Sequence, residues 1–157
     1  CLDWLAGQDL TDKIIIDYGC GSGILGVGAL LLGAKQVLAV DIDPQALLAT
    51  HQNAKLNGVE DKMLIFLPEE FKTHQKMHNI LADTITANIL AKPLIHFAPF
   101  FTTLLKNKGS IVLSGMIENQ VDDVMMAYQP YFDLDMPYHY ENSEDRHWYR
   151  LSAIKHS

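Results

Sequence analysis

The stretch that decides the fold is Asp-Tyr-Gly-Cys-Gly-Ser-Gly-Ile-Leu at residues 17–25, which connects a predicted strand to a predicted helix. The strand, 13–18, is a continuous run rich in isoleucine, as expected of a strand that is covered on both faces. The apolar segment 24–32 has helical length. Glycines allow positive φ and let a ligand approach the backbone, and the first N–H groups of a helix are unpaired. The stretch therefore predicts a strand–turn–helix unit that binds a ligand at its turn.

Strands and helices alternate along most of the chain. Asp43-Pro44 marks a helix start, with an N-cap and a proline in the first turn, and Asn57-Gly58 is a natural helix end. The predicted strands of this region are 13–18, 36–41, 63–66, 80–87 and 109–114. The predicted helices are 24–32, 44–57, 93–105 and 120–128. Such alternation requires a parallel sheet with right-handed crossovers and helices on both faces.

The pattern changes toward the carboxyl end. Residues 132–140 and 148–155 are extended segments joined by the polar stretch 141–147. Two strands joined by a short polar loop form an antiparallel hairpin. The predicted fold class is therefore α/β: a doubly wound, Rossmann-like, mostly parallel seven-stranded sheet with an antiparallel C-terminal hairpin. No repeat or linker divides the chain, so we expect one domain over residues 1–157.

Composition limits the possible functions. The chain has 12 Lys and Arg against 19 Asp and Glu, a net charge of −7, whereas nucleic-acid binders usually show a clustered basic face. The longest uncharged stretch, 20–34, is too short and too rich in glycine to span a bilayer. Two cysteines and no signal segment indicate a reducing compartment. We expect a cytoplasmic protein, in the simplest case a monomer, that binds neither nucleic acid nor membrane. Since the chain begins with Cys1, we also expect it to be the C-terminal part of a longer protein.

Two ligands fit the glycine turn. Residues 21–26 match the G-x-G-x-x-G pattern of NAD-binding turns, and Asp41 ends the second strand 22 residues after Gly19. A carboxylate there can accept hydrogen bonds from a ribose diol. S-adenosylmethionine also contains a ribose, but it carries a methionine arm and no phosphate. A purely structural role for the glycines, as a tight crossover, is a further alternative.

Three features favour S-adenosylmethionine. Asp17 lies two residues before Gly19 and places an acid where the ammonium of a methionine arm can sit, whereas a diphosphate is repelled there. The chain has no room for the second domain that usually supplies a dehydrogenase with its substrate. The closing hairpin is typical of the seven-stranded methyltransferase sheet. An NAD-binding domain is therefore the less favoured alternative.

Several segments together resemble one family. They are residues 17–25, Asp-Ile-Asp-Pro-Gln-Ala at 41–46, Asn-Ala-Lys-Leu-Asn-Gly-Val at 53–59, Ala-Asn-Ile-Leu-Ala at 87–91 and Leu-Ser-Gly-Met-Ile at 113–117. The chain is similar, over essentially its whole length, to the ribosomal protein methyltransferase family PrmA, whose members modify the large-subunit protein L-eleven. The first segment alone is typical of class I methyltransferases in general, whereas the segment 87–91 points to this family among them.

The resemblance implies an S-adenosylmethionine-dependent enzyme that methylates lysine side chains and an N-terminal amine of a ribosomal protein. It implies that Gly19 contacts the cofactor through its backbone, that Asp41 binds the ribose hydroxyls, and that Asn88 lies beside the cofactor at the end of the fourth strand. The predicted cofactor-binding set is Asp17, Gly19, Gly21, Gly23, Asp41 and Asn88.

The family also carries an N-terminal domain that docks the ribosomal protein and a threonine-rich loop that helps cover the cofactor. Neither is in this sequence. Two further alternatives therefore remain: a class I methyltransferase for another protein or a small molecule, and a cofactor-binding module without activity of its own.

Neither a catalytic base nor a metal site is predicted. An amine must lose its proton before it attacks the methyl carbon, and the side-chain carbonyl of Asn88 can orient it, although Asn88 can also simply cap its strand. We expect Cys20 to be a small buried side chain that supports the turn. His74 and His78 are four residues apart without a third ligand nearby, which favours a polar surface turn.

Overall fold

The computed structural model describes residues 1–141 and 147–157, so that most of the predicted hairpin loop lies outside the described residues. The strands are β1 (Ile14–Tyr18), β2 (Gln36–Val40), β3 (Met63–Phe66), β4 (Ala82–Asn88), β5 (Leu105–Ile117), β6 (Phe132–Leu134), β7 (Tyr138–Glu141) and β8 (His147–Lys155). The helices are α1 (Leu2–Ala6), α2 (Ile24–Leu31), α3 (Pro44–Leu56), the 3₁₀-helix Glu60–Lys62, α4 (Pro68–His78), α5 (Ala91–Leu104) and α6 (Glu118–Tyr128).

All strands belong to one sheet with the order β3-β2-β1-β4-β5-β8-β6, and β7 pairs with β8. The first five strands in this order are parallel, and β8 is antiparallel to β5, β6 and β7. The predicted doubly wound sheet with a C-terminal hairpin is therefore confirmed. The strand order reverses between β1 and β4, and ligands of open α/β sheets bind at the carboxyl ends of strands at such a point.

The sheet has eight strands instead of seven because the predicted strand 132–140 is interrupted. Both of its halves, β6 and β7, pair with β8. Leu134 pairs with Ala153 and Tyr138 with Arg150, so the register shifts by one residue between the halves. Pro137 lies in the gap and has no N–H to donate to β8. The two short strands together fill the seventh position of the sheet.

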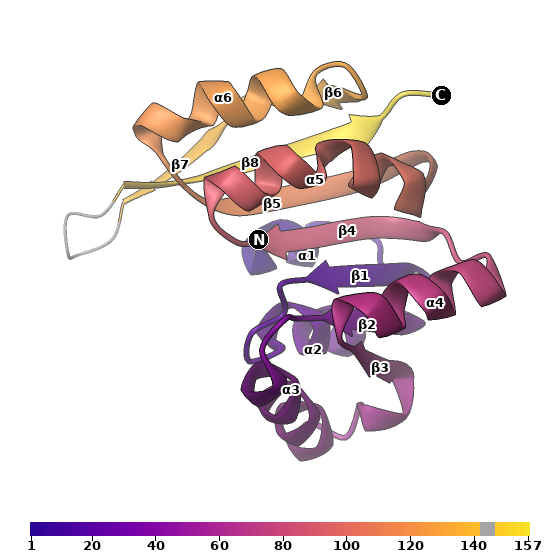
Figure 1. Ribbon diagram of the computed structural model, residues 1–157. Helices are drawn as coiled ribbons and strands as arrows, with labels where there is room; N and C mark the ends of the chain where they lie inside the picture. The colour runs from indigo at the N-terminus through magenta and orange to yellow at the C-terminus, as the bar shows by residue number, and fades with distance from the viewer. Residues whose placement is uncertain (142–146) are drawn as a thin grey trace.

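Helices cover both faces of the sheet and bury two separate cores. One core contains Ile16, Leu38 and Ile85 from the strands together with buried residues of α4, α5 and α6. The other contains Ile15 and Val37 together with buried residues of α1, α2 and α3. Neighbouring residues of one strand thus face opposite sides. Figure 1 shows α1 and α2 behind the strands and α4 and α5 in front of them.

Two helices, α1 and α4, were not predicted. In α4 Phe71 is the buried residue and the other positions are mostly polar, so the segment lacks an apolar stripe of helical period. The start signals are present, since Pro68 occupies the first turn and the Glu70 side chain accepts from the backbone N–H of Leu67. The prediction of a surface turn at His74 and His78 is wrong: both lie on α4, with ring centroids 4.4 Å apart. The predicted N-cap at Asp43 is confirmed by its hydrogen bond from Gln45 N–H.

The contact between α5 and α6 includes a buried hydrogen bond, from the hydroxyl of Tyr128 to the carbonyl oxygen of Leu94 at 2.9 Å. We expect Tyr128→Phe to lower the free energy of unfolding by about 1 kcal/mol, the usual net contribution of such a bond. The control Tyr131→Phe removes a hydroxyl that makes no hydrogen bond within the described part of the chain, and we expect it to change this free energy by less than about 0.5 kcal/mol. Urea denaturation measures both, and equal effects would contradict the assignment.

Candidate functional site

A cavity of about 800 Å³ opens at the carboxyl end of the parallel strands. We call it the turn cavity. Its lining includes Gly19 from the turn after β1, Asp41 at the end of β2 and Asn88 at the end of β4, together with side chains of α4 and α5 such as Lys72 and Phe97. It therefore lies where the strand order reverses and where the sequence predicted a ligand.

The turn after β1 requires glycine at its first position. Gly19 has φ +80°, and its N–H donates to the carbonyl of Val40 at 2.7 Å. A Cβ at residue 19 would overlap Cγ2 of Ile89, which follows β4. The glycine thus allows the ends of β1, β2 and β4 to meet at the cavity.

Helix α3 holds the rest of the turn. The hydroxyl of Thr50 donates to the carbonyl of Gly21 at 2.9 Å, and the side-chain amide of Asn53 donates to the carbonyl of Ser22 at 2.8 Å. Gly23 is the N-cap of α2 and lies against Thr50. Sequence analysis missed Thr50 and Asn53 as site residues. Their signal was a pair of polar residues three positions apart on the helix that follows Asp41.

Asp41 joins the end of β2 to the turn. Its Oδ2 accepts from the N–H of Gly21 and its Oδ1 accepts from the N–H of Asp43, both at 2.9 Å. Each carboxylate oxygen has two lone pairs, so one acceptor position remains on each oxygen. The side chain lines the turn cavity. These two free positions suit the two hydroxyls of a ribose diol.

Asp17 lies beneath the turn and is not part of the cavity wall. It is 1% exposed, and its carboxylate accepts from the N–H of Gly26 at 3.1 Å and from the hydroxyl of Thr86 at 3.0 Å. Burial raises the pKa of Asp17 from 3.8 to about 6, although both hydrogen bonds act in the opposite direction. Since side chains alternate along a strand, the next residue, Tyr18, faces the cavity instead. Asp17 therefore ties β1 to α2 and β4, a different position from the predicted one beside a ligand's ammonium.

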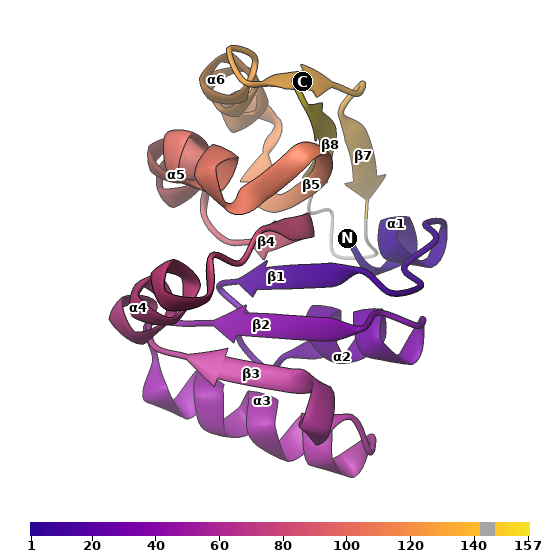
Figure 2. The same ribbon diagram turned by 90° about the vertical axis from the view of Figure 1, so that its right-hand side faces the viewer.

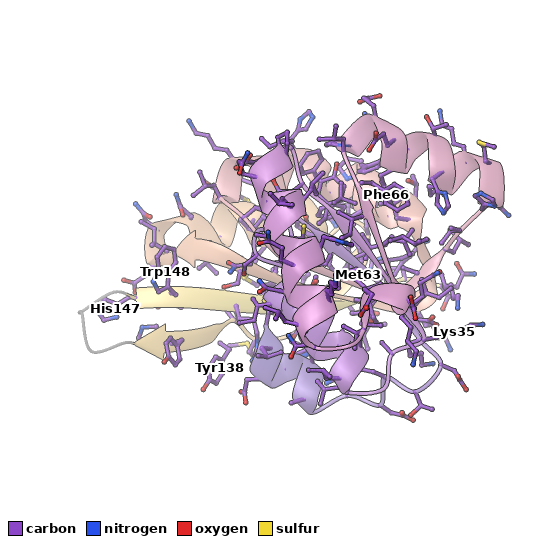
Figure 3. The ribbon with its side chains drawn as sticks, turned by 90° about the horizontal axis from the view of Figure 1, so that it is seen from below. Lys35, Met63, Phe66, Tyr138, His147 and Trp148 are labelled. Carbon is purple, nitrogen blue, oxygen red and sulfur yellow. The ribbon has the colours of Figure 1, made fainter. Side chains whose placement is uncertain are left out.

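A second cavity, of about 900 Å³, lies on the other side of the segment after β4. We call it the hairpin cavity. Asn88, Ile89 and Leu90 line both cavities, so this segment forms the wall that they share. The remaining lining comes from α1, β5, β7 and β8. In Figure 2, α1 lies beneath the end of β7. Figure 3 shows Tyr138 and Trp148 on the arm formed by β7 and β8.

The hairpin cavity combines aromatic side chains with a cation. The guanidinium carbon of Arg150 lies 4.5 Å from the ring centroid of Tyr138, and Arg150 Nε is buried without a hydrogen-bond partner among the described residues. Cys1 and Asp3 also line this cavity, so it contains a carboxylate as well as a cation.

Cys20 is buried, as predicted, and its thiol lies 3.4 Å from the Thr50 hydroxyl. Burial raises the pKa of Cys20 to about 12, so the thiol stays protonated. Among residues 1–141 and 147–157, no group of three or more His, Cys, Asp or Glu side chains could hold a metal ion. Within the same ranges, no helix is long and apolar enough to cross a membrane.

The structure thus brings five of the six predicted residues to the turn or the cavity: Gly19, Gly21, Gly23, Asp41 and Asn88. The sixth, Asp17, supports the turn from below. The aromatic residues and Arg150 of the hairpin cavity were not predicted as site residues, because β7 and β8 approach Asn88 only in the folded sheet.

Comparison with known proteins assigns the family. The model of the family described as ribosomal protein L11 methyltransferase (PrmA) matches residues 1–156. The chain belongs to this family. The resemblance identified in the sequence is therefore confirmed.

Relatives named ribosomal protein L11 methyltransferase are similar to almost the whole chain. The protein of Psychrobacter sp. (strain PRwf-1) is 59% identical over an alignment of 157 positions, which covers 98% of this chain and 51% of the relative. The protein of Acinetobacter baylyi is 55% identical, over 100% of this chain and 50% of the relative. The chain spans about half the length of the curated relatives it matches.

Solved structures have the same fold. The ribosomal protein L11 methylase of Lactobacillus delbrueckii subsp. bulgaricus superposes with a TM-score of 0.82 at 28% identity, over 99% of this chain and 77% of that one. An RNA methyltransferase of Salinibacter ruber, in complex with S-adenosyl-L-homocysteine, gives 0.74 at 16% identity, over 99% and 90%. The second likeness concerns the fold alone. Together they confirm the Rossmann-like methyltransferase fold.

The buried carboxyl of Asp17 makes stability depend on pH. Its pKa of about 6 in the folded protein exceeds the ordinary 3.8, so the group favours folding below pH ~4, and this contribution is lost as the pH rises through 6. The difference corresponds to about 3 kcal/mol, at about 1.4 kcal/mol per pKa unit. We expect Asp17→Asn to remove this part of the pH dependence of the free energy of unfolding, measured by urea denaturation between pH ~4 and ~7.

The exposed Asp61 provides the control, because Asp61→Asn removes one carboxylate without changing a buried one. The control should keep the wild-type slope. A wild-type slope in folded Asp17→Asn would show that the Asp17 carboxyl does not titrate in this range.

Proposed function

We propose that this chain is the catalytic domain of an S-adenosylmethionine-dependent methyltransferase that modifies amines of the large-subunit ribosomal protein L11. The observation that carries the proposal is the carboxylate of Asp41, which is held at the glycine turn by Gly21 and keeps one acceptor position free on each oxygen. The substrate is supported by the family, whose members are named for it.

The hydrogen bonds of the turn favour S-adenosylmethionine over NAD. A dinucleotide site needs free N–H groups at the turn and at the helix start, where the diphosphate binds. Here the N–H of Gly21 already donates to Asp41 and the N–H of Gly26 to Asp17. Both acceptors are carboxylates, which repel a diphosphate when ionised. S-adenosylmethionine needs no phosphate site, so it fits this turn better.

The chain's own residues supply binding and orientation. When bound, S-adenosylmethionine would supply an activated methyl group, whose carbon a neutral amine can attack in line while the thioether of S-adenosylhomocysteine leaves. Asp41 holds the ribose at the turn cavity. Asn88 lies in the shared wall, where its side-chain carbonyl can accept a hydrogen bond from an amine that enters through the hairpin cavity. Burial among the aromatic side chains of the hairpin cavity disfavours a charged ammonium there.

Other properties expected from the sequence stay predictions. They are a cytoplasmic location, a monomeric state, the absence of nucleic-acid binding and a separate N-terminal recognition domain. The low count of basic residues supports the absence of nucleic-acid binding, since 12 Lys and Arg face 19 Asp and Glu.

The ribose contact can be tested by calorimetry. We expect Asp41→Ala to weaken the binding of S-adenosylmethionine about 10- to 150-fold, because hydrogen bonds to a charged group contribute about 1.5–3 kcal/mol. Asp43→Asn is the matched control: it removes a negative charge two residues away and keeps the oxygen that accepts from Gln45 N–H. Unchanged affinity in folded Asp41→Ala, or tighter binding of NAD by the wild type, would contradict the assignment.

The substrate is tested with the complete gene product, S-adenosylmethionine and isolated ribosomal protein L11. We expect mass spectrometry to find methyl groups on lysine and N-terminal amines, and far fewer of them with Asp41→Ala when the cofactor concentration is near the wild-type Kd. Transfer to a different protein or to a small molecule would replace the proposed substrate. Cofactor binding without any transfer would indicate a binding module.

A further inference from the structure

The segment 113–117, which is one of the segments that resemble the family, contains a β-bulge. The candidate site described above assigns no role to this bulge. Ser114 of β5 pairs with Arg150 of β8, whereas Met116 pairs with Tyr149, so Gly115 is an extra residue on β5. Its φ is +97°. Bulges of this kind bend a strand and redirect the groups beside it. Here the bulge lies at the carboxyl end of β5, next to the end of β4.

Gly115 packs against the backbone of Ile89. A Cβ at residue 115 would overlap the carbonyl oxygen of Ile89 and lie 2.8 Å from its carbonyl carbon. These are backbone atoms, which cannot rotate away as the end of a long side chain can. The N–H of Ile89 also donates to the carbonyl of Ser114 at 3.2 Å. The bulge therefore fixes the peptide of Ile89.

The side chain of Ile89 is held from the opposite direction by Gly19, because a Cβ at residue 19 would overlap its Cγ2. Two glycines of positive φ, one in the turn and one in the bulge, thus enclose a single residue. The residue before Ile89 is Asn88, which is the last residue of β4 and pairs with Ser114. Any displacement of Ile89 would therefore move Asn88.

We propose that Gly115 is a positioning residue, which together with Gly19 clamps Ile89 and thereby places Asn88 in the wall between the two cavities. The inference rests on the proposed function, because the placement of Asn88 matters for the reaction only if an amine meets the cofactor there. Gly115 lines the hairpin cavity, whereas the cofactor side is held separately by the bond between Asp41 and Gly21. Loss of the clamp should therefore affect the transfer step more than cofactor binding.

The test is Gly115→Ala in the complete gene product. We expect kcat for methyl transfer to fall about tenfold or more at saturating cofactor, with the Kd of S-adenosylhomocysteine within about threefold of the wild type. Gly33→Ala is the matched control: φ at Gly33 is +106°, but a Cβ there would meet only Thr11 Oγ1 at 4.0 Å. It introduces the strain of positive φ without the overlap, so kcat should stay within about twofold.

Three outcomes would overturn the proposal. They are an unchanged kcat in folded Gly115→Ala, a loss of cofactor-product affinity as large as the loss of kcat, and an equal loss in Gly33→Ala. If Gly115→Ala does not fold, Ile89→Ala replaces it, because that variant keeps Gly115 and removes only the side chain held by Gly19. We expect a lower kcat there, and wild-type kcat would likewise overturn the clamp.

A second readout does not depend on activity. The side-chain amide resonance of Asn88, assigned by its loss in Asn88→Ala, should shift in Gly115→Ala and stay in place in Gly33→Ala. An unmoved resonance in folded Gly115→Ala would overturn the proposal. If the wild type transfers no methyl group to the ribosomal protein, the proposed function fails, but this resonance still decides whether Gly115 positions Asn88.

Discussion

The hydrogen bond from the N–H of Gly21 to Asp41 Oδ2, at 2.9 Å, connects the turn after β1 to the end of β2, and both residues line the turn cavity. The parallel pairing of the two strands ends at Tyr18 and Val40, which brings the turn directly beside Asp41. Because the donor is a backbone group, few side-chain rotations must be fixed to build the contact. The same bond occupies an N–H that a phosphate would otherwise use, so in the proposed function one interaction both orients Asp41 for the ribose and disfavours a dinucleotide.

Much of the candidate cofactor site at the glycine turn could be predicted from the sequence, because its residues follow strands that are consecutive in the chain. The glycines of 19–23 and the acid at 41 follow two consecutive parallel strands, and parallel strands end at the same edge of a sheet. The position of Asp17 could not be predicted in the same way. Adjacent residues of a strand face opposite sides, and the side that Asp17 takes is set by Gly26 and by Thr86, which lies 69 residues away.

The parts that could not be predicted have physical reasons of their own. Helix α4 buries little besides Phe71, so its sequence lacks the apolar period that marks a helix, and its start signals at Pro68 were the remaining indication. The break between β6 and β7 leaves no mark except Pro137, because both halves pair with the same partner strand. The hairpin cavity depends on the approach of α1 to β7 and β8 at opposite ends of the chain, which no local pattern encodes.

Each cavity is lined by an acidic and a basic side chain: Asp41 and Lys72 in the turn cavity, Asp3 and Arg150 in the hairpin cavity. The turn cavity contains the carboxylate of Asp41, which suits a cofactor with a positively charged sulfonium. In the hairpin cavity an ammonium group loses hydration among the aromatic walls and meets the guanidinium of Arg150, whereas the carboxylate of Asp3 attracts it. A protonated amine would be repelled a second time by the sulfonium and has no lone pair for the attack. Under the proposed function, desolvation among the aromatic walls and the charge of the sulfonium therefore favour the neutral amine at the shared wall beside Asn88.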